Sequence, residues 1–264
     1  MRINAAIVSV LALVVWSGCE ADNTATSHVD PVSDVFGVAG ITGTFVAASL
    51  SGETVHVHNE SRSVTRFAPA STFKIPNTLI ALELGIVESQ ASEFMWDGTD
   101  RGIERWNKDQ TLATAFKVSC VWCYQEVARK VGREHYEYAL AEINYGNSSI
   151  GDRVDLFWLD GSLQISAVEQ IDFLRDLYNY QLGFRREHID ILREIMVTQH
   201  TAESTIYAKT GWAATKPQVA WYVGFVESDN GTWLFAMNMR VDSPDQANLR
   251  EELSIRSLRA LEII

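Results

Sequence analysis

Strand-like segments of this 264-residue chain gather near its two ends, and helical periodicity dominates between them. Alternating and β-branched patterns predict five strands, at residues 42–49, 54–58, 205–209, 218–227 and 233–240. Turn sequences, Ser51-Gly52 and Asp229-Asn230-Gly231, join the first pair and the last pair as hairpins. We therefore expect an α+β fold, in which both ends of the chain build one central antiparallel sheet and the middle forms an inserted helical part.

Helix signals fill the middle of the chain and its C-terminus. The predicted helices cover residues 71–83, 121–131, 167–178, 187–197 and 248–261. Ser166 and Glu169 form a capping box at the start of the third helix. We expect residues 19–264 to form a single unit, with a sheet part at about 36–66 and 200–264 and a helical part at about 67–199.

The first eighteen residues have the pattern of a signal peptide. Arg2 precedes an apolar stretch over residues 5–16, which is too short to cross a bilayer comfortably. Ser17-Gly18-Cys19 resembles the end of a bacterial lipoprotein signal, although Trp16 is not the usual small aliphatic residue. Cleavage either creates a lipid-anchored Cys19 or falls a few residues later. Both alternatives predict export to the periplasm, with the polar residues 20–35 as a loose tether.

Charge and the rarer residue types exclude several classes of function. The formal net charge of −12 argues against nucleic-acid binding, and an anionic substrate would need local cations. The six histidines lie far apart except for His56-x-His58, so no metal site is expected. Cys120 and Cys123 are either a redox-active pair or buried thiols, and their apolar neighbours favour buried thiols.

The sequence Ser71-Thr72-Phe73-Lys74 opens an apolar helical segment. A serine and a lysine three residues apart share one helix face, so the amine can accept the proton of the hydroxyl nucleophile. Such a pair is common by chance. A Lys-Thr-Gly sequence is expected in only about one chain of this length in twenty, and here it occurs at Lys209-Thr210-Gly211.

The ordered set of motifs resembles the class D, or oxacillinase-type, serine β-lactamases. The motifs are Ser71-x-x-Lys74, Ser119-x-Val121, Tyr145-Gly146-Asn147 and Lys209-Thr210-Gly211. Residues 69–76, 157–159 and 221–227 are also similar, and the resemblance runs from about residue 40 to the end. It implies the β-lactamase/transpeptidase fold and the hydrolysis of β-lactam antibiotics.

The resemblance implies that Ser71 attacks the lactam carbonyl, while the backbone N–H groups of Ser71 and Trp212 form the oxyanion hole. Lys74 would be uncharged and add carbon dioxide to become an N-carboxylysine, the general base of both acylation and deacylation. Only burial shifts a lysine pKa far enough to leave the amine neutral, and Phe73, Val121 and Trp158 are candidates to bury it. Trp158 would donate its indole N–H to the base; otherwise it is an ordinary core aromatic.

Ser119 would lie between Lys74 and Lys209 and relay a proton to the leaving nitrogen; alternatively it is a helix N-cap. Lys209, Thr210, Gly211 and Arg250 would bind the substrate, with both cations near its carboxylate. Arg250 alternatively pairs with Glu251 or Asp242.

The Tyr145-Gly146-Asn147 motif is expected to be a structural turn. The expected ligands are small β-lactams and carbon dioxide or bicarbonate, with no metal and no other cofactor. A β-lactam sensor or penicillin-binding protein that deacylates very slowly is the alternative, followed by a non-catalytic lipoprotein. Neither the substrate spectrum nor the oligomeric state is predicted.

Overall fold

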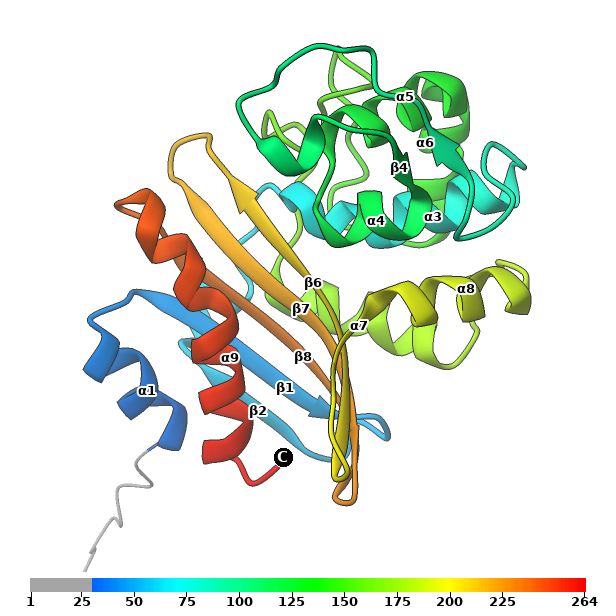
Figure 1. Ribbon diagram of the computed structural model, residues 1–264. Coiled ribbons are helices and arrows are strands. Elements are labelled where there is room, and N and C mark those ends of the chain that lie inside the picture. The colour runs from blue at the N-terminus through cyan, green and yellow to red at the C-terminus, as the bar shows by residue number, and fades with distance from the viewer. Residues whose placement is uncertain (1–29) are drawn as a thin grey trace, which may run out of the picture.

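The computed structural model describes residues 30–264 (Figure 1). The expected signal peptide, Cys19 and most of the expected tether lie outside these residues. Six antiparallel strands form the central sheet in the order β2-β1-β8-β7-β6-β5. They are β1 Gly43–Ser49, β2 Val55–His58, β5 Val197–His200, β6 Ser204–Ala213, β7 Val219–Ser228 and β8 Gly231–Arg240. Pairing of β1 with β8 joins the two ends of the chain, which confirms the predicted sheet.

Helices cover both faces of this sheet (Figure 1). On one face, α1 (Pro31–Ala39) packs beside α9 (Leu249–Ala260); on the other, α7 (Ala167–Tyr178) packs against β1 and β8. Successive residues of β7 alternate between the two cores, as Trp221 and Tyr222 do. Both faces are therefore buried, which explains the nearly continuous apolar run of this strand.

The middle of the chain is largely helical, but it is not all-helical as expected, because it also contains the short two-stranded sheet of β3 and β4. Its regular elements are η1 Ala70–Phe73, α3 Lys74–Glu83, β3 Glu93–Phe94, η2 Glu104–Trp106, β4 Gln110–Thr111, α4 Leu112–Lys117, α5 Val121–Val131, α6 Arg133–Glu142 and α8 Arg186–Met196. Two shorter elements, α2 Glu60–Ser63 and η3 Pro244–Asn248, lie in the sheet part. The predicted capping box is present, with Ser166 accepting from the N–H of Glu169 at 3.2 Å and Glu169 accepting from that of Ser166 at 2.9 Å.

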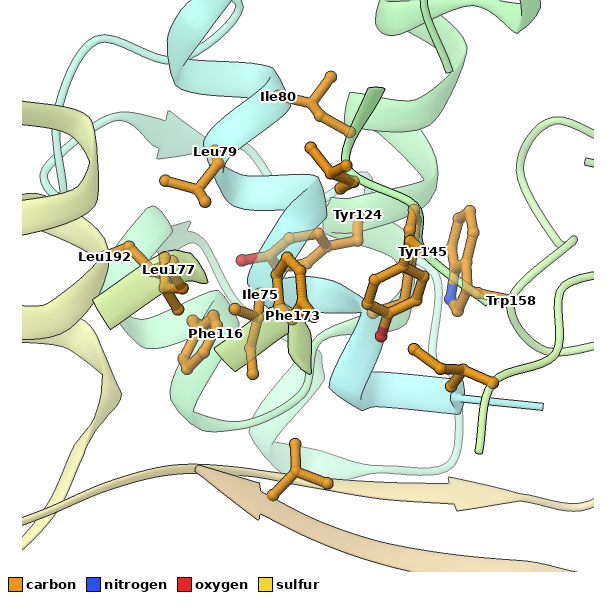
Figure 2. Packing of buried hydrophobic residues seen from close by; sticks show 14 of the residues in the cluster. Ile75, Leu79, Ile80, Phe116, Tyr124, Tyr145, Trp158, Phe173, Leu177 and Leu192 are labelled. Atoms are coloured by element: carbon orange, nitrogen blue, oxygen red, sulfur yellow. The ribbon is translucent and has the colours of Figure 1, made fainter. Parts of the chain in front are cut away.

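Aromatic side chains form much of the core around α3 (Figure 2). Phe73 stacks on Trp158 with their ring centroids 5.6 Å apart and meets Tyr145 edge-on at 5.8 Å. The carbonyl of Trp158 accepts the N–H of Ala70 at 2.9 Å. These contacts fix the segment that begins α3 against the loop that carries Trp158.

Three expectations about local structure were wrong. Residues 31–35 are not a tether but the start of α1, whose apolar side chains at Val32, Val35 and Phe36 share one face and are buried. The helix expected from residue 71 begins as the 3₁₀ turn η1 and becomes α-helical only at Lys74. Cys120 and Cys123 are buried, as expected, but they form a disulfide and are not free thiols.

No helix within residues 30–264 is long and apolar enough to span a bilayer.

Candidate active site

A cleft of about 380 Å³ lies between β6 and the helical part. It contains most of the predicted site residues: Ser71, Ser119, Val121, Thr210, Gly211, Trp212 and Arg250. Lys74 and Lys209 are not on its surface; they are buried behind it, with exposed fractions of 1% and 4%. The fold thus brings together residues that are separated by up to 179 positions in the chain (250 − 71).

Ser71 and Lys74 form the centre of the site. Ser71 lies in η1, and Lys74 is the first residue of α3, one turn further along the chain. The Nζ atom of Lys74 lies 3.1 Å from Oγ of Ser71, within hydrogen-bond distance. Ser71 is 9% exposed and faces the cleft. The hydroxyl is therefore open to a ligand, while the amine that contacts it is closed off from water.

Burial lowers the pKa of Lys74 to about 7, because an ammonium loses its hydration there. Phe73, the last residue of η1, and Trp158, which stacks on it, are both buried. A third aromatic residue, Tyr124, was not predicted; its ring centroid lies 4.8 Å from Nζ of Lys74. The hydroxyl of Tyr124 is 2.7 Å from that of Thr78, so this ring is fixed in place. At neutral pH a large fraction of Lys74 is consequently uncharged.

Lys209 connects the sheet to the Ser119 segment. Its Nζ donates to Oγ of Ser119 at 2.6 Å and also to the carbonyl and hydroxyl of Thr210, at 3.1 and 3.2 Å. Burial is the largest cause that lowers the pKa of Lys209, followed by the nearby charges of Lys74 and Arg250. The N-cap of α5 is Cys120 and not Ser119, so the N-cap interpretation of Ser119 was wrong.

Gly211 explains why β6 lies so close to the nucleophile. A Cβ at this position would lie 2.7 Å from the carbonyl oxygen of Pro69 and 3.1 Å from Cγ2 of Thr72. The glycine therefore lets the strand pack directly on η1. This contact places Thr210 and Trp212 beside Ser71 in the cleft.

Arg250 lies in the first turn of α9 and faces the cleft. Its Nη1 donates to the carbonyl of Ala247, and its Nε is buried without a partner among the described residues. Neither ion pair considered above forms within residues 30–264, and Asp242 instead pairs with Arg240 at 2.8 Å. Burial lowers the pKa of Arg250. Because Arg250 lines the cleft, its guanidinium can be reached by an anion bound there.

Trp158 is buried and packs on Phe73, which matches a core aromatic. This packing is compatible with a second role for its indole N–H, because the ring lies beside η1. The 145–147 motif is a turn: a Cβ at Gly146 would collide with the carbonyl of Gln164, and Asn147 accepts the N–H of Gln164 at 2.9 Å. The expected structural role of this motif is thus confirmed.

Part of the cleft wall was missed by the sequence analysis: Ile103, Arg105, Trp106, Lys117, Val118, Leu159 and Glu251. Arg105 and Trp106 belong to η2, and Ile103 directly precedes it. The sequence of this segment has neither helical nor strand periodicity. Only the cluster of a tryptophan beside an arginine at 105–106 marks this segment as unusual. Within residues 30–264, histidine, cysteine and acidic side chains nowhere gather in a group of three that suits a metal.

Comparison with known proteins is consistent with this geometry. The family model of the penicillin-binding protein transpeptidase domain matches residues 43–256. The β-lactamase OXA-48 of Klebsiella pneumoniae is 44% identical over 208 residues, which cover 78% of each chain. The β-lactamase OXA-10 of Pseudomonas aeruginosa is 34% identical over 262 residues, 98% of this chain and 96% of that one.

Solved structures are similar over the same range. The class D β-lactamase YbXI from Nostoc has a TM-score of 0.86 and 38% identity, and the match covers 88% of this chain and 98% of that chain. The fold and the paired serine and lysine define a serine enzyme of the penicillin-binding transpeptidase class. Within that class, the chain belongs to the class D β-lactamase family.

Proposed function

We propose that this protein hydrolyses the amide bond of β-lactam antibiotics through an acyl-enzyme on Ser71 and so confers resistance to them. The observation that carries the proposal is the contact of 3.1 Å between Ser71 and a lysine whose pKa is lowered to about 7. A neutral amine at this distance can accept the proton of the hydroxyl as it attacks. The family to which the chain belongs supports the choice of substrate.

Charge that develops on the carbonyl oxygen needs hydrogen-bond donors held in place beforehand. The N–H groups of Ser71 and Trp212 are the proposed donors, since η1 and β6 pack directly together at Gly211. The residues of η1 are buried, and β6 pairs with β7 along its whole length. The donors would therefore be aligned before the substrate arrives.

Lys74 is proposed to be carboxylated by carbon dioxide. The site suits this modification, because the amine is buried and neutral enough to react near pH 7, and Ser71 remains within hydrogen-bond distance. When present, the carbamate supplies the general base for acylation and for activating the hydrolytic water. Val121 lines the cleft and is proposed to shape the pocket, while the indole N–H of Trp158 is proposed to donate to the base.

Ser119 and Lys209 are proposed to deliver the proton to the leaving nitrogen. Their side chains are 2.6 Å apart, and Lys209 has a lowered pKa that favours release of a proton. Ser119 also faces the cleft. A proton can thus pass from the buried lysine to the hydroxyl and on to a group bound beside Ser71.

Arg250, Lys209 and Thr210 are proposed to bind the carboxylate of the substrate. Arg250 lines the cleft, and a guanidinium fork matches the geometry of a carboxylate. A net charge of −12 repels an anionic substrate, and the guanidinium of Arg250 supplies the local cation that such a substrate needs.

Turnover of a chromogenic cephalosporin tests the proposal, combined with mass spectrometry of the protein after exposure to benzylpenicillin. We expect steady hydrolysis by the wild type, and Ser71→Ala should form no covalent adduct. Ser51→Ala, in an exposed turn, is the matched control. A single stoichiometric burst without steady turnover would favour a sensor or penicillin-binding protein, and no adduct at all would favour a non-catalytic protein.

We also infer export to the periplasm, with Cys19 either lipidated or removed with the leader. The support is the apolar stretch over residues 5–16 followed by Ser17-Gly18-Cys19. The mass of the mature N-terminus distinguishes the two outcomes, and Cys19→Ala should abolish membrane attachment only if the cysteine is lipidated. Retention of all eighteen leader residues in a cytoplasmic protein would contradict export.

A further inference from the structure

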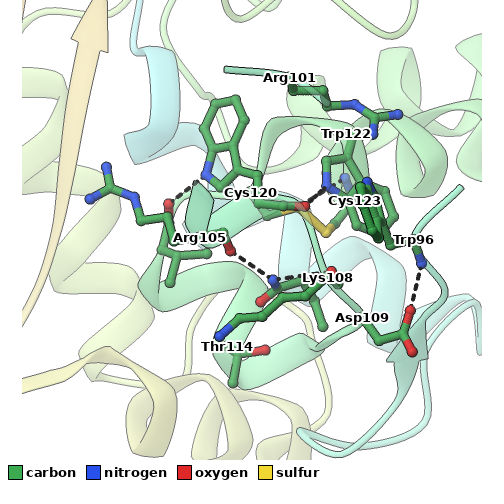
Figure 3. The surroundings of a disulfide bond; sticks show 12 residues. Trp96, Arg101, Arg105, Lys108, Asp109, Thr114, Cys120, Trp122 and Cys123 are labelled. Atoms are coloured by element: carbon green, nitrogen blue, oxygen red, sulfur yellow. Dashed lines mark hydrogen bonds between the residues drawn. A yellow bond between two sulfur atoms is a disulfide. The ribbon is translucent and has the colours of Figure 1, made fainter. Parts of the chain in front are cut away.

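A disulfide joins Cys120, the middle residue of the Ser119-x-Val121 segment, to Cys123, two residues beyond that segment (Figure 3). It links the N-cap of α5 to the third residue of its first turn, the two positions that a capping box joins by hydrogen bonds. We propose that this disulfide is a positioning element of the active site, which holds Ser119 against Lys209 and Val121 in the wall of the cleft. The proposal rests on the function proposed above.

The backbone of Ser119 needs support from its surroundings. Its φ of +56° lies in the left-handed region, which residues other than glycine rarely adopt. On its N-terminal side, the N–H of Ser119 donates to the carbonyl of Phe116 at 3.2 Å, and that of Cys120 to Ala115 at 2.8 Å. On its C-terminal side, the disulfide closes the first turn of α5. The strained residue is thus held between α4 and a covalently closed turn.

The first turn of a helix is where fraying begins, because its N–H groups lack partners within the helix. In α5 the Sγ of Cys120 accepts the N–H of Cys123 at 3.3 Å, in addition to the covalent bond. Val121 is the first helical residue and lies between the two cysteines. Fraying of this turn would therefore move Val121 and release the peptide that sets the direction of Ser119.

The same turn also holds η2, another part of the cleft wall. The indole N–H of Trp106 donates to the carbonyl of Val118 at 3.0 Å, and that of Trp122 donates to the carbonyl of Trp106 at 2.9 Å. Trp122 lies inside the ring that the disulfide closes, and Trp106 lines the cleft. In Figure 3, Arg105 extends away from the disulfide. Loosening of the turn would hence disturb η2 as well as Ser119.

The burial of Cys120 and Cys123 distinguishes them from catalytic redox cysteines. Both residues are fully buried, whereas thiol–disulfide exchange needs an accessible sulfur. A reductant should therefore act on the folded protein slowly, and the bond should function as a permanent constraint. The dithiol form has to be made by refolding.

The test compares the two forms of one chain. Protein with Cys19→Ser, which leaves Cys120 and Cys123 as the only cysteines, is refolded with either reduced or oxidised glutathione. In the second case, two thiols and one glutathione disulfide yield the protein disulfide and two reduced glutathiones. We expect acylation by benzylpenicillin to be about 10- to 100-fold slower in the dithiol form. A displacement of a catalytic group by about 1 Å causes a loss of this size. Unfolding that form and refolding it with oxidised glutathione should restore the rate.

Acylation rates are expressed per molecule that forms a covalent adduct, so that a smaller yield of folded protein does not lower the measured rate. Leu140→Ala, in the buried face of α6, is the control for stability alone: it should lower Tm and leave the acylation rate unchanged. If the dithiol form fails to refold, the double variant Cys120→Ser, Cys123→Ser provides the same comparison, because serine can still cap α5.

Equal acylation rates of the disulfide and dithiol forms, even with different Tm values, would overturn the positioning role. A lowered rate in Leu140→Ala of the same size would also overturn it, because the effect would then follow stability. Absence of hydrolysis by the oxidised form would instead contradict the proposed function, so the two failures are distinguishable.

Discussion

Nζ of Lys74 lies 3.1 Å from Oγ of Ser71, and the lysine is the more deeply buried of the two. The order of burial matters for chemistry. A nucleophile has to meet its substrate, whereas its base has to lose a positive charge that water would stabilise. The serine lies in η1 at the cleft, and the lysine lies one turn further along and deeper in the protein. Two adjacent turns of one segment therefore give the nucleophile access to substrate and keep its base away from water.

Activity should depend on pH through Lys74. Its pKa of about 7 means that the amine is mostly neutral above this pH and protonated below it. Hydrolysis should therefore decline as the pH falls below about 7, and added bicarbonate should restore part of it, because only the neutral amine adds carbon dioxide. Steady-state rates from pH 5 to 9, with and without bicarbonate, measure this. Lys74→Ala should be inactive and not rescued; rescue of that variant by bicarbonate would refute the assignment.

Trp158→Phe should slow deacylation more than acylation. The substitution keeps an aromatic ring against Phe73 but removes the indole N–H that is proposed to stabilise the base. Pre-steady-state kinetics separate the two steps, and an acyl-enzyme that accumulates is the expected sign. Trp233→Phe, among residues packed on the other face of the sheet, is the control. Weaker binding with unchanged deacylation would leave Trp158 as a core residue only.

Arg250→Gln should raise KM for β-lactams by about tenfold or more, because a hydrogen bond to a charged group contributes about 1.5–3 kcal/mol. Arg259→Gln, an exposed position further along α9, should change KM little. Steady-state kinetics with benzylpenicillin and with its methyl ester complete the comparison. The effect of Arg250 should largely disappear with the ester, and an equal effect on both substrates would mean that it does not bind the carboxylate.

Gly211→Ala should lower both activity and stability. The added Cβ would lie 2.7 Å from the carbonyl oxygen of Pro69, so β6 and η1 would have to separate. Overpacking of this kind costs about 1–3 kcal/mol. Gly37→Ala, in α1, is the control, because a Cβ there meets no atom within 4 Å. Thermal unfolding and kcat/KM measure the two effects; full activity of Gly211→Ala would show that the close packing is unnecessary.

Much of the fold could be predicted because local and global signals agree. The helix over residues 121–131 begins and ends as the periodicity predicts, and the Ser166 capping box starts α7 where it was expected. The helix α1 was missed because it is only nine residues long and directly follows a polar stretch, so its apolar side chains at Val32, Val35 and Phe36 did not stand out as a helical face. Its stability comes from packing beside α9, which only the tertiary fold provides.

The site was predicted less completely than the fold. Helical spacing predicted the contact between Ser71 and Lys74, and the resemblance to class D enzymes implied that Ser119 and Lys209 lie at the same site; both pairs are in contact. Residues of η2 were missed because this segment reaches the cleft through the Trp106 and Trp122 hydrogen bonds, which have no periodic signature. The disulfide was missed for a different reason: two nearby cysteines can be free or bonded, and only the geometry of the α5 turn distinguishes these states.

The pKa of Lys74 tests the account most directly, because the amine has to be uncharged both to accept the proton of Ser71 and to add carbon dioxide. NMR titration of protein with ¹³C-labelled lysine, in buffer free of carbon dioxide, measures it, with Lys74→Ala identifying the signal. We predict a pKa of about 7. A value near 10.4, that of a lysine in water, would contradict the account.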